Sequence, residues 1–152
     1  MRANPRHRAR EFALQGLYQL QVSGNAPSTI RQELAEATGF ERADAAYFEA
    51  LWSGVSTGGD ALVAALAPHL DRRCEALSPI ERAILVIGAW ELEHRREIPY
   101  RVVINEAVEL AKAYGGTDGH KFVNGVLDRL AAGVRADEIR AGADERAARR
   151  PG

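Results

Sequence analysis

The chain has 152 residues, a length that suits one domain with enough material to bury a core. Its hydrophobic content of 46%, charged content of 27% and net charge of −1 are ordinary for a globular protein. This charge balance argues against a protein coated in positive charge for bulk nucleic-acid binding. Because Cys74 is the single cysteine, an internal disulfide and a multi-thiolate zinc site are both excluded.

The sequence has no segment near the roughly 20 apolar residues that a membrane-spanning helix needs. Its N-terminus also lacks the apolar stretch of a secretory signal, because arginines run directly into a mixed pattern. An organelle transit peptide is disfavoured by Glu11 and by the immediate helical periodicity. We therefore expect a cytoplasmic protein that does not enter membranes.

The apolar pattern predicts helices almost throughout, and no convincing period-two alternation supports a sheet. The first helix is expected over about residues 5–22 and ends at the Ser23-Gly24-Asn25 turn. Its inward positions are Ala9, Ala13, Leu17 and Leu20. Three more helices are expected over about residues 28–38, 44–55 and 60–67, with glycine or proline between them.

The clearest helix start is Ser78-Pro79-Ile80-Glu81, which places serine at the N-cap, proline at the first position and an acid close to a capping-box site. The following run from Ala83 to Trp90 contains no charged residue. It predicts the central, most buried helix of the fold, which Glu91 to Glu97 should return to solvent.

Two more helices are expected, from Pro99 to Gly115 and over about residues 117–132. After Gly133 the chain contains almost no large apolar residue. The predicted organisation is therefore a helical domain over residues 1–135 and a disordered tail over residues 136–152.

The last of these helices presents two different faces. Val123, Val126, Leu127 and Leu130 form an apolar stripe that must be buried. Asp118, Lys121, Phe122 and Gly125 repeat the same spacing on another side, as a surface for stacking and charge rather than catalysis. The alternative is that Phe122 packs under a neighbouring helix and Gly125 allows a close helix crossing. Spacing alone leaves both interpretations open.

The first helix carries a second such face. Arg8, Glu11, Gln15 and Tyr18 follow helical spacing opposite the inward stripe, and the first ten residues hold Arg2, Arg6, Arg8 and Arg10 without an acid. Arginines can pair with phosphates and an exposed tyrosine can stack on an unpaired base, which favours single-stranded RNA over duplex DNA. The alternative is that Tyr18 covers the edge of the core while the arginines only solubilise the terminus.

Signatures of catalysis and metal binding are missing. The four histidines, His7, His69, His94 and His120, are scattered singly and form no metal-ligand pair. Glu106 and Glu109 lie three residues apart, a spacing common on solvated or ion-paired helix faces. We expect neither an enzyme nor a cofactor.

Three motifs carry a resemblance to a known family. They are Arg8-Ala-Arg-Glu11 with Ala13-Leu-Gln-Gly-Leu-Tyr18, then the segment PYRVVINEAVELAK over residues 99–112, and HKFVNGVLD over residues 120–128. Over about residues 6–134 the chain resembles the bacterial transcription antitermination factors of the NusB family. The resemblance implies an all-α fold of about seven helices in two small packed bundles.

The resemblance also implies a function and partners. Members of this family pair with the ribosomal protein NusE, bind the boxA element of nascent RNA and join NusA, NusG and RNA polymerase during ribosomal RNA transcription. By position, it implies RNA contacts at Arg6, Arg8, Arg10, Tyr18, Asp118, Lys121 and Phe122, and a NusE surface around Glu75 and Glu81. His7 departs from the pattern, because another basic residue often stands there. Glu81 is also the expected capping residue, so its two roles could compete.

Three other interpretations remain. NusB-like domains also occur at the N-terminus of RNA cytosine methyltransferases, but such an enzyme needs a separate domain for S-adenosylmethionine, and this chain ends at Gly152. A helical adaptor that binds only protein is a second alternative. A homodimer in the absence of the partner is a third, because a partner-binding face can self-associate.

Overall fold

A computed structural model describes residues 4–150, and this part of the chain contains helices and no strand. Its α-helices are α1 (Pro5–Ser23), α2 (Pro27–Ala35), α3 (Ala45–Thr57), α4 (Gly59–Leu66), α5 (Pro79–His94), α6 (Tyr100–Tyr114), α7 (Gly119–Val134) and α8 (Ala136–Arg149). Short 3-10 turns are η1 (Phe40–Arg42), η2 (Ala67–His69) and η3 (Cys74–Ala76). The all-α prediction is confirmed. None of the helices in residues 4–150 has the length and apolar character required to cross a membrane.

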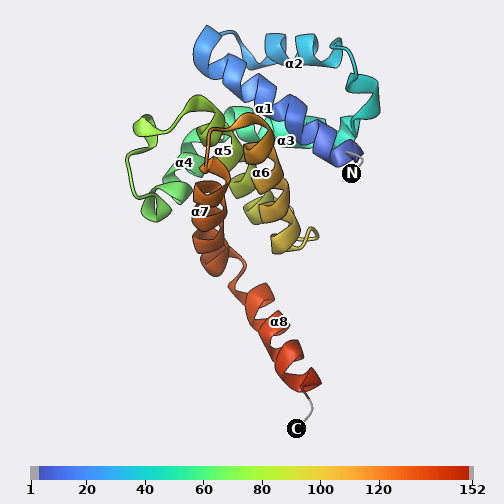
Figure 1. Cartoon of the computed structure of the whole chain (residues 1–152). Coiled ribbons are helices and arrows are strands. Elements are labelled where there is room, and N and C mark those ends of the chain that lie inside the picture. Colours follow the sequence, from blue (N-terminus) through green and yellow to red (C-terminus); the bar gives the residue numbers. More distant parts are fainter. Residues whose placement is uncertain (1–3, 151–152) are drawn as a thin grey trace.

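Helix α5 lies at the centre of the molecule. It contacts α1 and α3 on one side, and α4, α6 and α7 on the other, so that two small helical groups share it (Figure 1). Every residue from Ala83 to Trp90 is buried, as the uncharged run predicted. The start of α5 is also as expected, because the Ser78 hydroxyl accepts a hydrogen bond from the Glu81 backbone N–H at 3.1 Å.

The apolar stripe of α7 faces this central helix. Val123, Val126, Leu127 and Leu130 are all buried, which confirms the predicted face. The close approach between α5 and α7 occurs at Gly88, where a Cβ atom would lie 2.7 Å from Leu127 Cδ1. At Gly125 a Cβ atom would meet only the Arg129 side chain, at 3.3 Å. The interpretation of Gly125 as a helix-crossing residue is therefore wrong.

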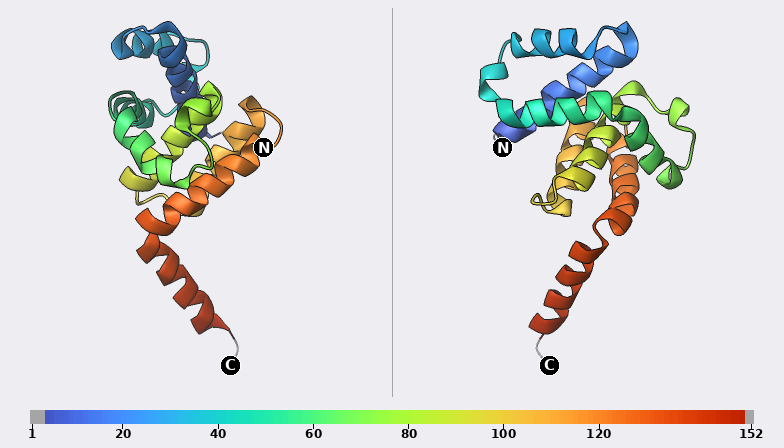
Figure 2. Two further views of the ribbon diagram at one scale, coloured as in Figure 1. Left: turned by 90° about the vertical axis from the view of Figure 1, so that its left-hand side faces the viewer. Right: turned by 180° about the vertical axis from the view of Figure 1, so that it is seen from behind.

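Helix α8 occupies residues for which we expected a disordered tail. It extends away from the body in all views (Figures 1 and 2) and contains no buried residue. Its first turn is hydrogen-bonded to the body of the protein through Glu138. The Tyr100 backbone N–H donates to Glu138 Oε2 at 2.8 Å, and Arg135 Nη1 donates to Glu138 Oε1 at 2.6 Å. Glu138 thereby caps the start of α6. The division into a domain and a tail stays a prediction.

Candidate nucleic-acid interface

The arginine-bearing start of α1 is fixed against the body of the protein. The Asn4 side chain caps the helix by accepting from the His7 backbone N–H at 2.7 Å. The exposed Arg6 guanidinium lies 4.6 Å from the centre of the Tyr47 ring, where it retains access to solvent. Arg8 is half-buried and lines a groove beside α1. Arg2 lies outside the described residues.

Arg10 points into the protein, so its selection as an RNA contact is wrong. It is 2% exposed, and its Nε and Nη2 donate to the Glu91 carboxylate at distances of 2.9 and 2.8 Å. The correct placement was visible in the helical spacing. Arg10 precedes the buried Ala13, Leu14 and Leu17 by three, four and seven residues, so it belongs to the inward stripe.

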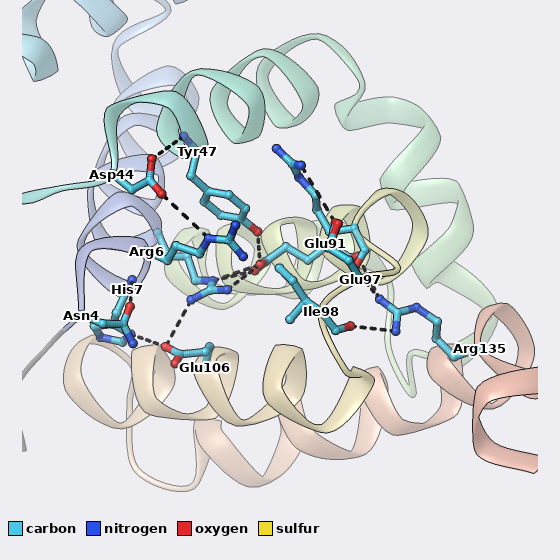
Figure 3. Close-up of polar contacts among 12 residues, drawn as sticks. Asn4, Arg6, His7, Asp44, Tyr47, Glu91, Glu97, Ile98, Glu106 and Arg135 are labelled. Atoms are coloured by element: carbon cyan, nitrogen blue, oxygen red, sulfur yellow. Dashed lines mark hydrogen bonds and ion pairs between the residues drawn. The ribbon is translucent and has the colours of Figure 1, made fainter. Parts of the chain in front are cut away.

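Glu91 is the buried partner of this arginine, and the expectation that it returns α5 to solvent is wrong. It is 1% exposed and also accepts a hydrogen bond from the Tyr47 hydroxyl (Figure 3). Burial, reinforced by the Glu91 carboxylate, raises the pKa of Tyr47. A charge this deep is tolerated because Arg10 neutralises it with paired hydrogen bonds.

A second ion pair joins α1 to α6. His7 Nδ1 lies 2.5 Å from Glu106 Oε2 (Figure 3). Arg10 Nη1 lies 3.5 Å from the same oxygen. The hydrogen bond with Glu106 raises the pKa of His7 and lowers the pKa of the Glu106 carboxyl. The histidine therefore retains more positive charge toward neutral pH than a free histidine would. Glu106 is an ion-paired side chain, as the spacing of the α6 acids suggested.

At the start of α7, Asp118 and Lys121 form an exposed pair. Asp118 adopts the left-handed conformation with φ of +64°, which lets the chain turn into the helix. Lys121 Nζ lies 3.4 Å from Asp118 Oδ1, with both side chains mostly in solvent. The ion pair holds the Lys121 ammonium beside the Asp118 carboxylate, while both groups remain accessible to solvent.

Phe122 lies between the two interpretations that the sequence left open. It packs against the core but is only half-buried. The Arg72 guanidinium lies 4.5 Å from the ring centre and is held by Asp71 at 2.8 Å. A base at this position would stack on the phenylalanine after displacing Arg72, or on the outer face of the guanidinium. Arg72 is a candidate that sequence reasoning missed.

The face predicted on α1 forms one wall of a surface groove. Arg8, Glu11, Gln15 and Tyr18 all line it, which confirms that these four side chains share one side of the helix. The groove has a volume of about 410 Å³. Tyr114, at the end of α6, also lines the groove and was missed. The available signal was its place in the last helical turn, directly before two glycines.

Of the two acids expected to meet a protein partner, Glu81 lies near the start of α7. Glu75 is exposed on η3, and Glu81 is half-buried in the first turn of α5. Glu81 Oε2 lies 3.2 Å from the position that a Cβ atom would take at Gly119, next to the N-terminus of α7. Within the described residues its carboxylate makes no hydrogen bond to Ser78, so the reciprocal bond of a capping box is not formed.

Comparison with known proteins places the chain in a family. The model of the NusB family matches residues 7–132. The transcription antitermination protein NusB of Paraburkholderia phytofirmans is 54% identical over 136 residues, which cover 90% of this chain and 94% of that protein. The protein of the same name from Azoarcus sp. (strain BH72) is 56% identical over 137 residues, which cover 90% of this chain and 88% of that protein.

Solved structures agree with this placement. The structure of T. maritima NusB superposes with a TM-score of 0.76 at 29% identity, covering 88% of this chain and 94% of that one. A structure of the antitermination factors NusB and NusE in complex with dsRNA gives a TM-score of 0.73 at 28% identity, covering 82% of this chain and 95% of that one. The chain belongs to the NusB family.

Proposed function

We propose that this protein is a transcription antitermination factor that binds boxA-type single-stranded RNA together with ribosomal protein NusE. In this role it joins NusA, NusG and RNA polymerase in the cytoplasm and supports processive transcription of ribosomal RNA operons. It acts by binding rather than by catalysis. The observation that carries the proposal is the family match over residues 7–132, which spans both candidate faces, on α1 and on α7.

The chemistry of these two faces supports RNA binding. Arg6 and Lys121 are exposed cations that can neutralise phosphates. Tyr18 is 41% exposed, and Phe122 is half-buried. Aromatic faces beside cations are the common means of holding unpaired bases. The single-strand preference is our proposal, whereas the related NusB and NusE structure was determined with dsRNA.

The position of the partner acids supports a shared assembly. Glu75 and Glu81 can pair with basic groups of NusE, and Glu81 lies beside the α7 terminus that also carries Asp118 and Lys121. A partner bound there would extend the RNA surface directly. We therefore expect NusE to increase RNA affinity through proximity of the two surfaces.

The test is fluorescence anisotropy with three RNAs: a boxA-like single strand, a scrambled strand and a duplex of the boxA-like sequence. Each is titrated with and without NusE, using wild type, Phe122→Ala and a control, Tyr100→Ala, which removes a half-buried ring at the far end of α6. The proposal expects binding that prefers the boxA-like single strand, strengthens with NusE and falls about tenfold in Phe122→Ala alone. Equal, weak binding to all three RNAs would leave a helical adaptor that binds only protein.

A further inference from the structure

The groove beside α1 has features that the general RNA-binding role does not explain. Its walls come from α1, the loop before η1, the first turn of α5 and the end of α6. Its volume of about 410 Å³ falls within the range of small-ligand sites and is ample for one nucleotide. Four segments therefore hold this groove in place.

Two tyrosines flank this groove with unusually accessible rings. Tyr18 is 41% exposed and Tyr114 is 49% exposed, and both are among the few large apolar residues in the described part of the chain that remain exposed. An exposed aromatic ring leaves apolar surface in contact with water, and a base that stacks on the ring covers that surface. The groove therefore offers aromatic surface for a flat ring.

The Glu11 carboxylate, which also lines the groove, is a polar group that a ligand could contact. The Tyr114 hydroxyl donates to Glu11 Oε2 at 2.5 Å, and this bond raises the pKa of Tyr114 to about 12. Glu11 Oε1 has no hydrogen-bond partner among residues 4–150. The carboxylate is thus held in one orientation with an acceptor oxygen unused, which is the arrangement that recognises a donor on a bound molecule.

The charges of the groove indicate which part of an RNA strand enters it. A phosphate would be repelled by Glu11 and is better placed at Arg8, on the same helix face. The edge of a base can instead donate hydrogen bonds to the carboxylate. Cytosine offers its N4 amino group, and adenine and guanine also carry amino groups. Uracil offers one N–H between two carbonyl oxygens, which would face the carboxylate unfavourably.

We propose that this groove holds one unpaired base of the bound RNA and that Glu11 selects a base with an exocyclic amino group over uracil. The inference rests on the proposed function and deepens it. Tyr114 acts as a stacking surface and orients Glu11, while Gln15 lines the same wall as a second polar group. Tyr114, Glu11 and Gln15 thus join the candidate RNA contacts.

The experiment uses a set of boxA-like 12-mers in which each position in turn carries cytidine or uridine, with NusE present. These two bases share ring size, so the comparison isolates the amino edge. For wild type, one position should favour cytidine about tenfold, the discrimination typical of a well-placed contact between a side chain and a base edge. In Glu11→Gln that preference should fall to about twofold or less, because an amide can both donate and accept.

Glu109→Gln is the matched control, since Glu109 is an exposed carboxylate on α6 that does not line the groove. It removes the same charge and should keep the tenfold preference. Tyr114→Ala should weaken binding of cytidine and uridine at that position and also reduce the cytidine preference, because it removes both the stacking surface and the hydroxyl that orients Glu11. A wild type with no cytidine preference, or a preference unchanged in Glu11→Gln, overturns the inference while the antitermination role stands. No binding of any strand by wild type with NusE would instead overturn the proposed function.

Discussion

Two ion pairs of this protein have the same chemistry and opposite surroundings. Arg10 and Glu91 join α1 to α5 with side chains 3% and 1% exposed. Lys121 and Asp118 join two neighbouring turns at the start of α7 with side chains 73% and 67% exposed. In sequence each pair is a cation and an acid in a helical segment, and only the surroundings differ.

The difference shows how burial divides structural charges from candidate binding charges. A buried pair has lost its hydration, so each partner depends on the other and neither can be offered to a ligand. An exposed pair gains little from its contact, and its groups can exchange partners at low cost. The His7 and Glu106 pair, at 17% and 20% exposure, lies between these limits. The effects of substitutions should follow this order.

The largest effect is expected from Glu91→Ala. It removes the closest partner of the buried Arg10 charge, leaving only Glu106 at 3.5 Å, and also removes the acceptor of the Tyr47 hydroxyl. We expect the free energy of unfolding to fall by about 3–5 kcal/mol, measured by urea denaturation.

The double variant Arg10→Met with Glu91→Leu is the matched control, because it removes both charges together. It should recover most of the lost stability, since a buried pair replaced by apolar side chains is often neutral. Arg31→Ala, which breaks the exposed pair with Glu49, should leave the denaturation midpoint nearly unchanged. A double variant as unstable as Glu91→Ala would contradict the argument.

Arg135→Ala should have the next largest effect. The fully buried guanidinium donates to the carbonyl oxygens of Leu92, Ile98 and Arg95 at distances of 2.7, 3.0 and 2.9 Å. Removing it strands these acceptors at the end of α5, at a cost of about 3 kcal/mol in the free energy of unfolding. Arg140→Ala, in the exposed part of α8, is the control and should show no change. Equal stability of the two variants would show that the end of α5 is satisfied by other groups.

The half-buried pair of His7 and Glu106 should contribute to the free energy of unfolding in a pH-dependent way. The raised pKa of His7 gives stability that is fully present below pH 6.5 and is lost as pH rises through its folded-state pKa. The lowered pKa of Glu106 gives stability that is present above pH 4.5 and is lost as pH falls through its folded-state pKa. His7→Gln should therefore cost about 1 kcal/mol near pH 5.5 and much less near pH 8.5.

Denaturation at the two pH values measures this difference. His94→Gln is the control, because His94 is mostly exposed and its nearest acid, Glu93, is 3.9 Å away. The cost of this substitution should be small, because the histidine is exposed. A cost for His7→Gln that is the same at both pH values would assign the contact a packing role only.

Much of the fold could be predicted from apolar periodicity. The uncharged run from Ala83 to Trp90 identified α5 as the central helix, and the stripe from Val123 to Leu130 gave the buried face of α7. Periodicity was least informative for charged residues. Glu91 was expected in solvent because an acid after an apolar run usually ends burial, and its partner Arg10 lies 81 residues earlier in the chain.

The candidate site was predictable only in part, for the same reason. The shared face of Arg8, Glu11, Gln15 and Tyr18 follows from spacing within one helix, and the structure confirms it. Tyr114 and Arg72 come from other segments, so their proximity to these faces depends on tertiary packing. Spacing within a helix reveals which side chains share a side, but it does not reveal what lies opposite.

The smallest effect is expected for the exposed pair of Asp118 and Lys121, and it should appear in the affinity for RNA. Asp118 places a negative charge where a phosphate would approach, and Lys121 lies within 3.4 Å of it. Asp118→Asn keeps the shape, removes the repulsion and frees Lys121, so boxA-like RNA should bind about threefold tighter at roughly 0.1 M salt, where the screening length is about 10 Å. Asp128→Asn is the matched control, since it lies about 15 Å further along α7, beyond the screening length. A loss of affinity in Asp118→Asn would show that the carboxylate accepts a hydrogen bond from the RNA. An exposed charge would then depend on its ligand in the same way that Glu91 depends on Arg10.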